Sequence, residues 1–506
     1  MNETFKAAMQ AGYTFKGRSF KIGVAKYRDQ PLADCPISIP LKMMNRHGLI
    51  AGATGTGKTK TLQIIAEGLS DNGIPVMLMD IKGDLSGIAA PGSLNAFIEE
   101  RYRIMGEQYI PTAFPVELLT LSREKGVRLR ATVTEFGPVL FSRILDLNDT
   151  QSGLLSVLFK YCDDNGLPLL DLKDMVKTLQ FAADEGKAAI EKDYGKISTT
   201  SLSTIQRKVI ELQNQGGDLF FGELSFDPRD LMHTDRNGKG YINILRLIDL
   251  QDRPKLFAAF MLQLLAEIYG MMPESGDLEQ PRLVIFIDEA HLVFKEASAT
   301  LLSQIETIIK LIRSKGIGIF FCTQNPQDVP AAVLGQLGLK IQHALRAFTA
   351  KDRKDIRLTA ENYPLSDFYK PEEVITSMGT GEAMVTLLNE KGIPTPLAHV
   401  YLMSPRSRMD ILTEQEIDSL LQASALVQKY NQDIDRDSAY EILSRRIQQA
   451  PQETHETARQ APAPKRSSRT KEPPGMIEKM LNSSVGKQAQ RSLVRGLFGI
   501  ITKMFK

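Results

Sequence analysis

The chain has 506 residues, of which 42% are hydrophobic and 24% are charged, and its formal net charge at pH 7 is +2. This length allows a sizeable core and more than one structural unit, whereas the small net charge excludes a strongly basic nucleic-acid-coating protein but not a motor that grips DNA with a few residues. The N-terminus lacks the basic start and apolar run of a secretory signal, and no apolar stretch reaches 18 residues, so we expect neither a leader nor a transmembrane helix. The three cysteines, Cys35, Cys162 and Cys322, lack metal-ligand spacing, and we expect unpaired thiols in a reducing cytoplasm.

Residues 1–45 form a short N-terminal segment with one strand-like stretch at Phe20–Val24. From Gly48 onwards short apolar strands alternate with helices, which is typical of an α/β fold with a mostly parallel sheet covered on both faces. A helix is expected at Lys58–Leu69, because Leu62, Ile65 and Leu69 recur on one face. The predicted strands are His47–Ala51, Ile74–Met79, Val116–Leu121, Tyr241–Leu245, Leu283–Ile287, Gly316–Cys322, Lys340–Leu345 and Ala383–Leu388.

The pattern changes within the core that we expect at residues 46–405. Between residues 138 and 220, helix-like stretches at Gln151–Tyr161, Leu172–Ala183 and Thr200–Gln213 follow one another without a convincing strand, which predicts a helical insertion. After the core we expect a helical extension at 406–449, a flexible linker rich in Pro, Thr, Arg and Lys at 450–475, and a basic amphipathic helix at 476–506. That last helix could dock on a partner or a membrane surface, or pack on its own protein or a sister subunit.

A glycine-rich segment lies between the first predicted strand of the core and its first predicted helix. Gly52, Gly55 and Gly57 allow the backbone to curl so that successive N–H groups point at phosphate oxygens, and the start of the helix adds its positive end. In such a loop Lys58 reaches the β- and γ-phosphates of ATP, and the hydroxyl of Thr59 binds Mg²⁺. The predicted nucleotide contacts are Gly52, Ala53, Thr54, Gly55, Thr56, Gly57, Lys58, Thr59 and Lys60.

Acidic and polar residues follow three other apolar strands, and the carboxyl ends of parallel strands meet at one edge of the sheet. Asp288 would bind the Mg²⁺ shell and Glu289 would orient or deprotonate the attacking water, which favours hydrolysis over binding alone. Gln324, after the next strand, is a candidate sensor of the γ-phosphate. Asp80 could join the metal site if its strand neighbours the phosphate loop, or it could simply form a turn.

The stretch downstream of Gln324 is too short for a second motor lobe, which argues against a two-lobed helicase. A single core commonly completes its active site in an oligomer, where a neighbouring subunit presents an arginine to the γ-phosphate. Arg46, Arg313, Arg346 and Arg353 are candidates, although a surface salt bridge is the commoner role for any one arginine.

Taken together, these motifs resemble the HerA–FtsK group of motors, and within it the bacterial HerA-like proteins of the YjgR type. The resemblance rests on residues 46–59, 79–84, 287–291, 312–317 and 322–330, and it covers most of residues 40–405. It implies a RecA-like core, a homo-hexameric ring and DNA translocation driven by ATP and Mg²⁺. By motif position it makes Glu289 catalytic, Gln324 a sensor, and Arg46 and Arg313 stabilisers of transition-state charge.

The sequence departs from HerA in one respect. HerA carries an N-terminal β-barrel that helps it to dock a nuclease, whereas about 45 residues precede the motor here, which puts a nuclease partner in doubt. A protein-remodelling or membrane-associated ATPase is the alternative function, and the basic segment at 476–506 is the reason for it.

Overall fold

The computed structural model describes residues 2–250, 253–276, 278–295, 299–434 and 436–456. The chain divides into two compact units. Of the described residues, unit 1 contains those within 2–129 and 226–432, and unit 2 contains those within 130–225 and 433–456. The basic helix predicted at 476–506 lies outside the described residues, as does the predicted linker beyond residue 456.

Unit 1 is built on one mixed sheet of 12 strands, in the order β2-β1-β12-β11-β10-β3-β9-β8-β4-β7-β5-β6. Every pair from β10 through β3 to β6 is parallel, and the pairs from β10 outwards to β2 are antiparallel. The predicted α/β class with a mostly parallel sheet is confirmed. The strands are β1 (Ser19–Tyr27), β2 (Gln30–Pro40), β3 (Gly48–Ala51), β4 (Val76–Asp80), β5 (Val116–Thr120), β6 (Val127–Arg128), β7 (Ile242–Arg246), β8 (Leu283–Ile287), β9 (Ile317–Thr323), β10 (Leu339–Gln342), β11 (Glu382–Leu387) and β12 (Ala398–Leu402).

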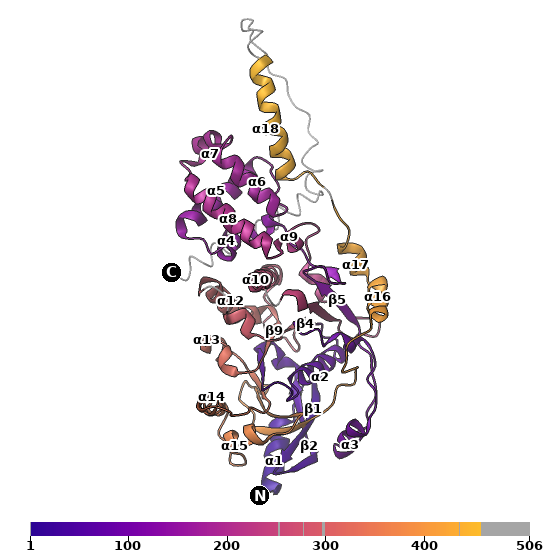
Figure 1. Cartoon of the computed structure of the whole chain (residues 1–506). Helices are drawn as coiled ribbons and strands as arrows, with labels where there is room; N and C mark the ends of the chain where they lie inside the picture. Colours follow the sequence, from indigo (N-terminus) through magenta and orange to yellow (C-terminus); the bar gives the residue numbers. More distant parts are fainter. Residues whose placement is uncertain (1, 251–252, 277, 296–298, 435, 457–506) are drawn as a thin grey trace. The chain divides into compact units, whose positions relative to one another are not determined.

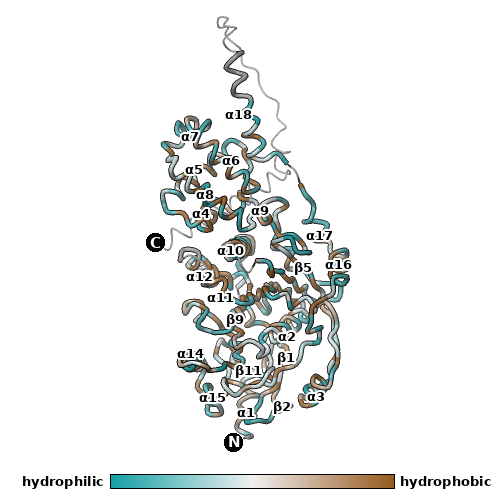
Figure 2. The backbone as a smooth tube through the Cα atoms, viewed as in Figure 1, coloured by the Kyte–Doolittle hydropathy of each residue, from teal (hydrophilic) through white to brown (hydrophobic). Residues whose placement is uncertain are grey.

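Helices flank this sheet and connect its parallel strands, as parallel pairing requires (Figure 1). In the middle of the sheet, β4, β8 and β9 are buried along their whole length. Brown, hydrophobic segments gather in this central part of unit 1 in Figure 2. The helices of unit 1 are α1 (Asn2–Tyr13), α2 (Lys58–Asp71), α3 (Ala96–Ile104), α10 (Pro254–Met271), α11 (His291–Lys295), α12 (Ala299–Ile312), α13 (Ala331–Leu334), α14 (Ala350–Glu361), α15 (Pro371–Ser377), α16 (Glu414–Ala423) and α17 (Ala425–Tyr430).

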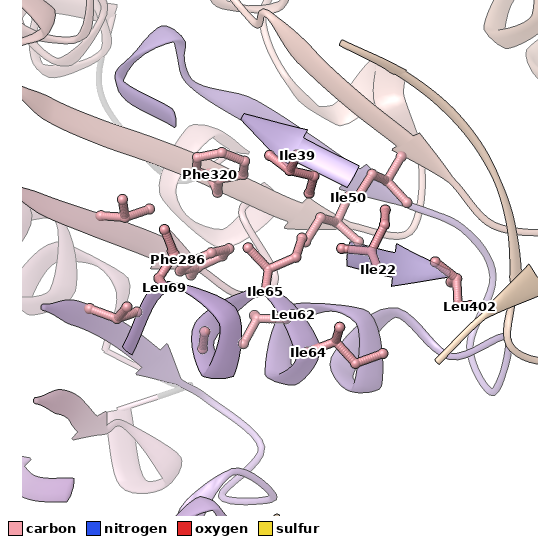
Figure 3. Packing of buried hydrophobic residues seen from close by; sticks show 14 of the residues in the cluster. Ile22, Ile39, Ile50, Leu62, Ile64, Ile65, Leu69, Phe286, Phe320 and Leu402 are labelled. Carbon is pink, nitrogen blue, oxygen red and sulfur yellow. The ribbon is translucent and has the colours of Figure 1, made fainter. Parts of the chain in front are cut away.

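The core of unit 1 lies where α2 packs against the sheet. Leu62, Ile65 and Leu69 of α2 are at most 1% exposed, as the helical spacing predicts, and they face Phe286 of β8 and Phe320 of β9 (Figure 3). Full burial of each such aliphatic side chain contributes about 1.5–3 kcal/mol. This packing fixes α2, and therefore the loop that leads into it, against the strands that bear the acidic residues.

β1 is longer than the predicted stretch, and β2, β6 and β12 were not recognised at all. β1 and β2 extend the sheet beyond the predicted core of residues 46–405. β2 contains prolines, and proline normally indicates that a segment is not a strand. β2 lies at the edge of the sheet, however, where proline is tolerated. Residues 19–40 therefore belong to the same sheet as β3, the strand that leads into the phosphate loop, and do not form a separate segment.

Unit 2 is helical apart from short backbone bridges. Phe136, Phe141, Phe220 and Phe221 contact one another at its centre, with ring centroids 4.9–6.5 Å apart. Its helices are α4 (Val133–Ile144), α5 (Asp149–Asp164), α6 (Leu172–Ala183), α7 (Lys187–Tyr194), α8 (Thr199–Asn214), α9 (Gly217–Phe220) and α18 (Ala439–Glu456). The stretch predicted as a helical extension at 406–449 is thus divided, because α16 and α17 belong to unit 1 and α18 to unit 2.

No helix in the described part of the chain has both the length and the hydropathy of a membrane span. The three cysteines are buried and form no disulfide.

Candidate active site

The glycine-rich segment joins the carboxyl end of β3 to the start of α2. Gly52, Gly55 and Gly57 have φ angles of 150°, 79° and 110°, which glycine adopts readily and other residues rarely do. The backbone N–H of Gly52 donates to the carbonyl of Thr323 at the end of β9 (3.2 Å). The N–H of Ala53 donates to the carbonyl of Ala344 beyond β10 (2.9 Å). Both neighbouring strands therefore hold the start of the loop.

A buried histidine lies beside two of these glycines and excludes a side chain at Gly52. A Cβ on Gly52 would lie 2.5 Å from Cβ of His343, and a Cβ on Gly57 would lie 3.6 Å from its Cε1. His343 is fully buried, and its Nε2 lies 2.9 Å from the hydroxyl of Thr61 in α2. Burial, together with the charge of Lys58, lowers the pKa of His343 to about 4. A neutral imidazole thus supports the loop from beneath.

Lys58 and Thr59 are the first two residues of α2, whose N-terminus carries the positive end of the helix dipole. The Lys58 side chain is 6% exposed, and its Nζ donates to the carbonyls of Gly52 (2.6 Å) and Ala53 (3.2 Å). Burial lowers the pKa of Lys58, and the charge of Lys82 acts in the same direction. A phosphate at this loop would offer the ammonium group charged oxygens in place of neutral carbonyls.

The other predicted loop residues have different surroundings. Thr54 and Gly55 are exposed at the outer side of the loop. The hydroxyl of Thr56 donates to the carbonyl of Ala53 (2.7 Å) and closes the turn. The side chain of Lys60 donates to the carbonyl of Met409 (2.6 Å), so any contact of Lys60 with a phosphate would come from its backbone N–H.

Two buried carboxylates follow β8, which pairs with β9, the neighbour of β3. Asp288 is 4% exposed and Glu289 is 5% exposed. Oδ2 of Asp288 is buried without a hydrogen-bond partner, and burial raises the pKa of this residue to about 7, opposed by the charge of Lys82 and reinforced by that of Glu289. Glu289 has a φ of 45°, a costly conformation for a residue with a side chain, and such strain often marks a functional position.

Glu289 has two basic partners that the sequence analysis did not identify. Nζ of Lys82 lies 2.5 Å from Oε1 of Glu289, and Nδ1 of His291 lies 3.2 Å from its Oε2. Burial lowers the pKa of Lys82, but the bond to Glu289 and the nearby carboxylates outweigh that effect, so the pKa is raised overall. Lys82 lies just after β4, and β4 is adjacent to β8. The sequence signal for this partner was a basic residue between the acidic residues Asp80 and Asp84.

Of the two remaining predicted strand-end residues, one lies beside the phosphate loop and the other does not. Gln324 directly follows β9 and is exposed at the edge that holds the phosphate loop. Asp80 ends β4, which does not neighbour β3, because β9 and β8 lie between them. The Asp80 carboxylate accepts the backbone N–H groups of Gly83, Asp84 and Leu85 at 2.7–3.3 Å. It therefore shapes the loop that carries Lys82.

The candidate arginines divide between the two edges of the sheet. Arg46 ends the short 3₁₀ helix (Leu41–Arg46) before β3 at the amino edge, where its carbonyl accepts the N–H of Gly338. Arg313 lies in a short 3₁₀ helix (Arg313–Lys315) before β9, whose seven residues span about 20 Å to the edge with the phosphate loop. Burial lowers the pKa of His47 to about 4. Nε2 of His47 lies 2.9 Å from the carbonyl oxygen of Ile309, four residues before Arg313, so Arg313 lies close to the residue that follows Arg46. Arg46 and Arg313 are thus far from the phosphate loop of their own chain.

Arg346 and Arg353 lie at the opposite, carboxyl edge. Arg346 follows β10 and donates to the carbonyls of Thr376 (2.7 Å) and Met378 (3.2 Å), and exposed Arg353 is on α14. Arg346 therefore has a local structural role.

Comparison with known proteins agrees with this arrangement. The family model described as "Helicase HerA-like C-terminal" matches residues 26–504, which is most of the chain. This chain belongs to the HerA-like helicase family. Two curated relatives, the DNA double-strand break repair helicases HerA of Sulfolobus acidocaldarius and Sulfurisphaera tokodaii, are each 22% identical, over 353 and 357 residues, or 69% and 70% of this chain. The matched regions cover 64% of the length of each relative.

Solved structures agree with the fold of this HerA-like chain. The bacterial conjugative coupling protein TrwB, in an unbound form, matches with a TM-score of 0.52 and 14% identity over 80% of this chain and 94% of that one. TrwB in complex with ADP and Mg²⁺ matches with a TM-score of 0.50 and 15% identity, over 79% of this chain and 99% of that one. The predicted RecA-like P-loop fold is confirmed.

The phosphate loop of this HerA-like chain and the residues around it fit ATP and Mg²⁺. Within the described residues, no group of three or more His, Cys, Asp or Glu side chains could hold a metal ion by itself. Mg²⁺ commonly binds with few protein ligands, shared with phosphate oxygens and water. The hydroxyl of Thr59 and the unpartnered Oδ2 of Asp288 fit that arrangement. When bound, the metal would neutralise phosphate charge, and Asp288 would hold it while Glu289 oriented the water.

Proposed function

We propose that this HerA-like chain is an ATP-driven DNA translocase that works as a homo-hexameric ring in the cytoplasm. The observation that carries the proposal is that Lys58, Asp288 and Glu289 lie at the carboxyl ends of the central strands, whereas Arg46 and Arg313 lie at the amino ends. A complete hydrolytic site needs a cation that stabilises charge on the γ-phosphate in the transition state. An arginine at the amino edge can meet that need only at the nucleotide of another subunit.

The family supports DNA as the substrate, since the two curated relatives are named as DNA double-strand break repair helicases. A translocase couples hydrolysis to movement, so DNA should stimulate its ATPase rate. Because phosphate contacts dominate non-specific DNA binding, the stimulation should decline steeply as salt is raised. An ATPase rate that is unchanged by single-stranded and duplex DNA at low salt, with no DNA binding, would overturn the DNA assignment.

Mixing two inactive variants tests the ring. An Arg313→Ala subunit retains its own Glu289, and a Glu289→Gln subunit retains its Arg313. If Arg313 acts on the neighbouring subunit, mixed rings contain some intact sites and the mixture regains ATPase activity. If Arg313 acts within its own chain, the mixture stays as inactive as its components.

Arg103→Ala is the matched control for this experiment. Arg103 is an exposed arginine on α3 that pairs with Glu100 three residues away, and its loss should leave the ATPase rate unchanged. The molecular mass of the wild-type assembly in solution should also be measured with and without ATP, and we expect the mass of a hexamer. A strict monomer under all conditions would contradict the ring.

A further inference from the structure

A short turn before β11 touches the phosphate loop. This turn, Met378–Gly381, follows α15, and the N–H of Gly381 donates to the carbonyl of Thr56 (3.2 Å). A Cβ on Gly57 would lie 3.4 Å from the nitrogen of Gly381, so the two segments are in van der Waals contact. Gly379 and Thr380 are exposed beside the loop.

Arg101 of α3 holds the carboxyl half of the turn. It is 3% exposed, and its guanidinium donates to the carbonyls of Gly381 (3.1 Å), Leu402 (2.6 Å) and Thr380 (3.4 Å). It also lies over the ring of Tyr401, 4.0 Å from the centroid. Burying a guanidinium among carbonyls is costly, and burial lowers the pKa of Arg101. The fold accepts this cost at a turn that adjoins the nucleotide loop.

Two more charged groups hold the rest of the turn. Arg346 binds the carbonyls of Thr376 and Met378, as described above. Glu382 accepts the N–H of Gly379 (3.3 Å) and pairs with Lys26 (2.7 Å) and His399 (2.9 Å). The backbone of this exposed turn is therefore fixed from both sides, which is how a binding element is pre-organised.

The strand order indicates which end of a nucleotide the turn would meet. β9 and β8, with Gln324 and Glu289, lie on one side of β3, and β10 and β11 lie on the other. A nucleotide whose γ-phosphate points to Glu289 therefore extends its ribose and base towards β10 and β11.

We propose that the Gly379–Gly381 turn binds the ribose–base end of ATP, with the hydroxyl of Thr380 in contact with the nucleoside and Arg101 as a positioning residue. The proposal rests on ATP binding at the phosphate loop. It assigns the turn the recognition of the nucleoside, which the phosphate loop by itself does not supply.

The test compares ATP with inorganic tripolyphosphate, which lacks ribose and base, by calorimetric titration of the full-length protein. Arg101→Met and Thr380→Ala should each weaken ATP binding, by about tenfold for Arg101→Met, which corresponds to about 1.4 kcal/mol. Tripolyphosphate affinity should stay within about twofold, because both variants leave the phosphate loop intact. Arg103→Met, on the exposed face of the same helix, should change neither affinity.

Each other outcome has a distinct meaning. Equal weakening of ATP and tripolyphosphate would show that the turn only supports the phosphate loop, and it would overturn the proposal. Unchanged ATP affinity in Thr380→Ala would show that Thr380 does not contact the nucleoside, and it would overturn the proposal. This result can be obtained even if Arg101→Met fails to fold. If wild-type protein bound neither ligand while remaining folded, ATP binding itself would be refuted, independently of the turn.

Discussion

Nζ of Lys82 lies 2.5 Å from Oε1 of Glu289, so the loop after β4 supplies the cation that faces the proposed catalytic carboxylate. The pairing depends on the sheet order, in which β4 is hydrogen-bonded to β8. The side chain of Lys82 is 38% exposed and that of Glu289 is 7% exposed, so the buried carboxylate depends on this ammonium group for its charge compensation. We infer that Lys82 orients Glu289.

Replacing Lys82 tests this role. Lys82→Met should lower kcat for ATP hydrolysis by about tenfold, because a mispositioned catalytic group costs part of its usual contribution, while the Kd for ATP changes little. Lys6→Met, which removes a surface ion pair with Asp34, is the control and should leave kcat unchanged. An unaltered kcat in Lys82→Met would contradict the inference.

Glu289→Gln separates binding from hydrolysis. The amide is nearly the same size but cannot accept a proton, so kcat should fall by about 100-fold or more, whereas ATP should still bind. Single-turnover hydrolysis and nucleotide titration measure the two steps. Equal hydrolysis rates for the variant and the wild type would leave Glu289 without a catalytic role.

Gly52→Ala should damage the phosphate loop. The new methyl group would lie 2.5 Å from Cβ of His343 on a backbone with a φ of 150°, so strain and overlap add. We expect a loss of about 1–3 kcal/mol in the free energy of unfolding, together with loss of ATP binding. Urea unfolding and nucleotide titration measure both.

The control for this change is Gly153→Ala in α5, where a Cβ meets no atom within 4 Å. That variant should be neutral or slightly more stable, because alanine is a better helix former than glycine. If Gly52→Ala behaved in the same way, the steric account of the loop would be wrong.

His343 predicts a dependence of stability on pH. Its pKa is about 4 in the folded protein and near 6.5 in the unfolded chain, so the unfolded chain takes up the proton first as the pH falls. The stabilisation from neutral His343 is fully present above pH 6.5. It is lost progressively as the pH falls from 6.5 through 4, and the total loss is about 3 kcal/mol for this group. His343→Gln should remove that part of the slope.

Urea unfolding at several pH values between 7.5 and 4 measures the effect. His47 has a similarly lowered pKa of about 4, so the His343→Gln protein should keep roughly the share of the slope that His47 contributes. Identical slopes in the wild type and the variant would show that His343 does not titrate in this way.

Local sequence was sufficient for most of the parallel sheet and for the nucleotide motif. The apolar run Leu283–Ile287 is β8 with the predicted bounds, and the helix predicted at Lys58–Leu69 ends at Asp71. Short-range patterns of hydrophobicity determine such elements, and the glycines of the loop adopt the left-handed conformations that the motif requires.

The tertiary structure alone decided which strands are neighbours, and hence which side chains meet. It inserted β8 and β9 between β3 and β4, which takes Asp80 away from the phosphate loop and brings Lys82 to Glu289. It also set Arg46 and Arg313 at the edge opposite Lys58, and it joined Arg101 to a turn 280 residues later in the chain. Strand order and such long-range contacts depend on how whole layers pack, and no local periodicity in the sequence encodes them.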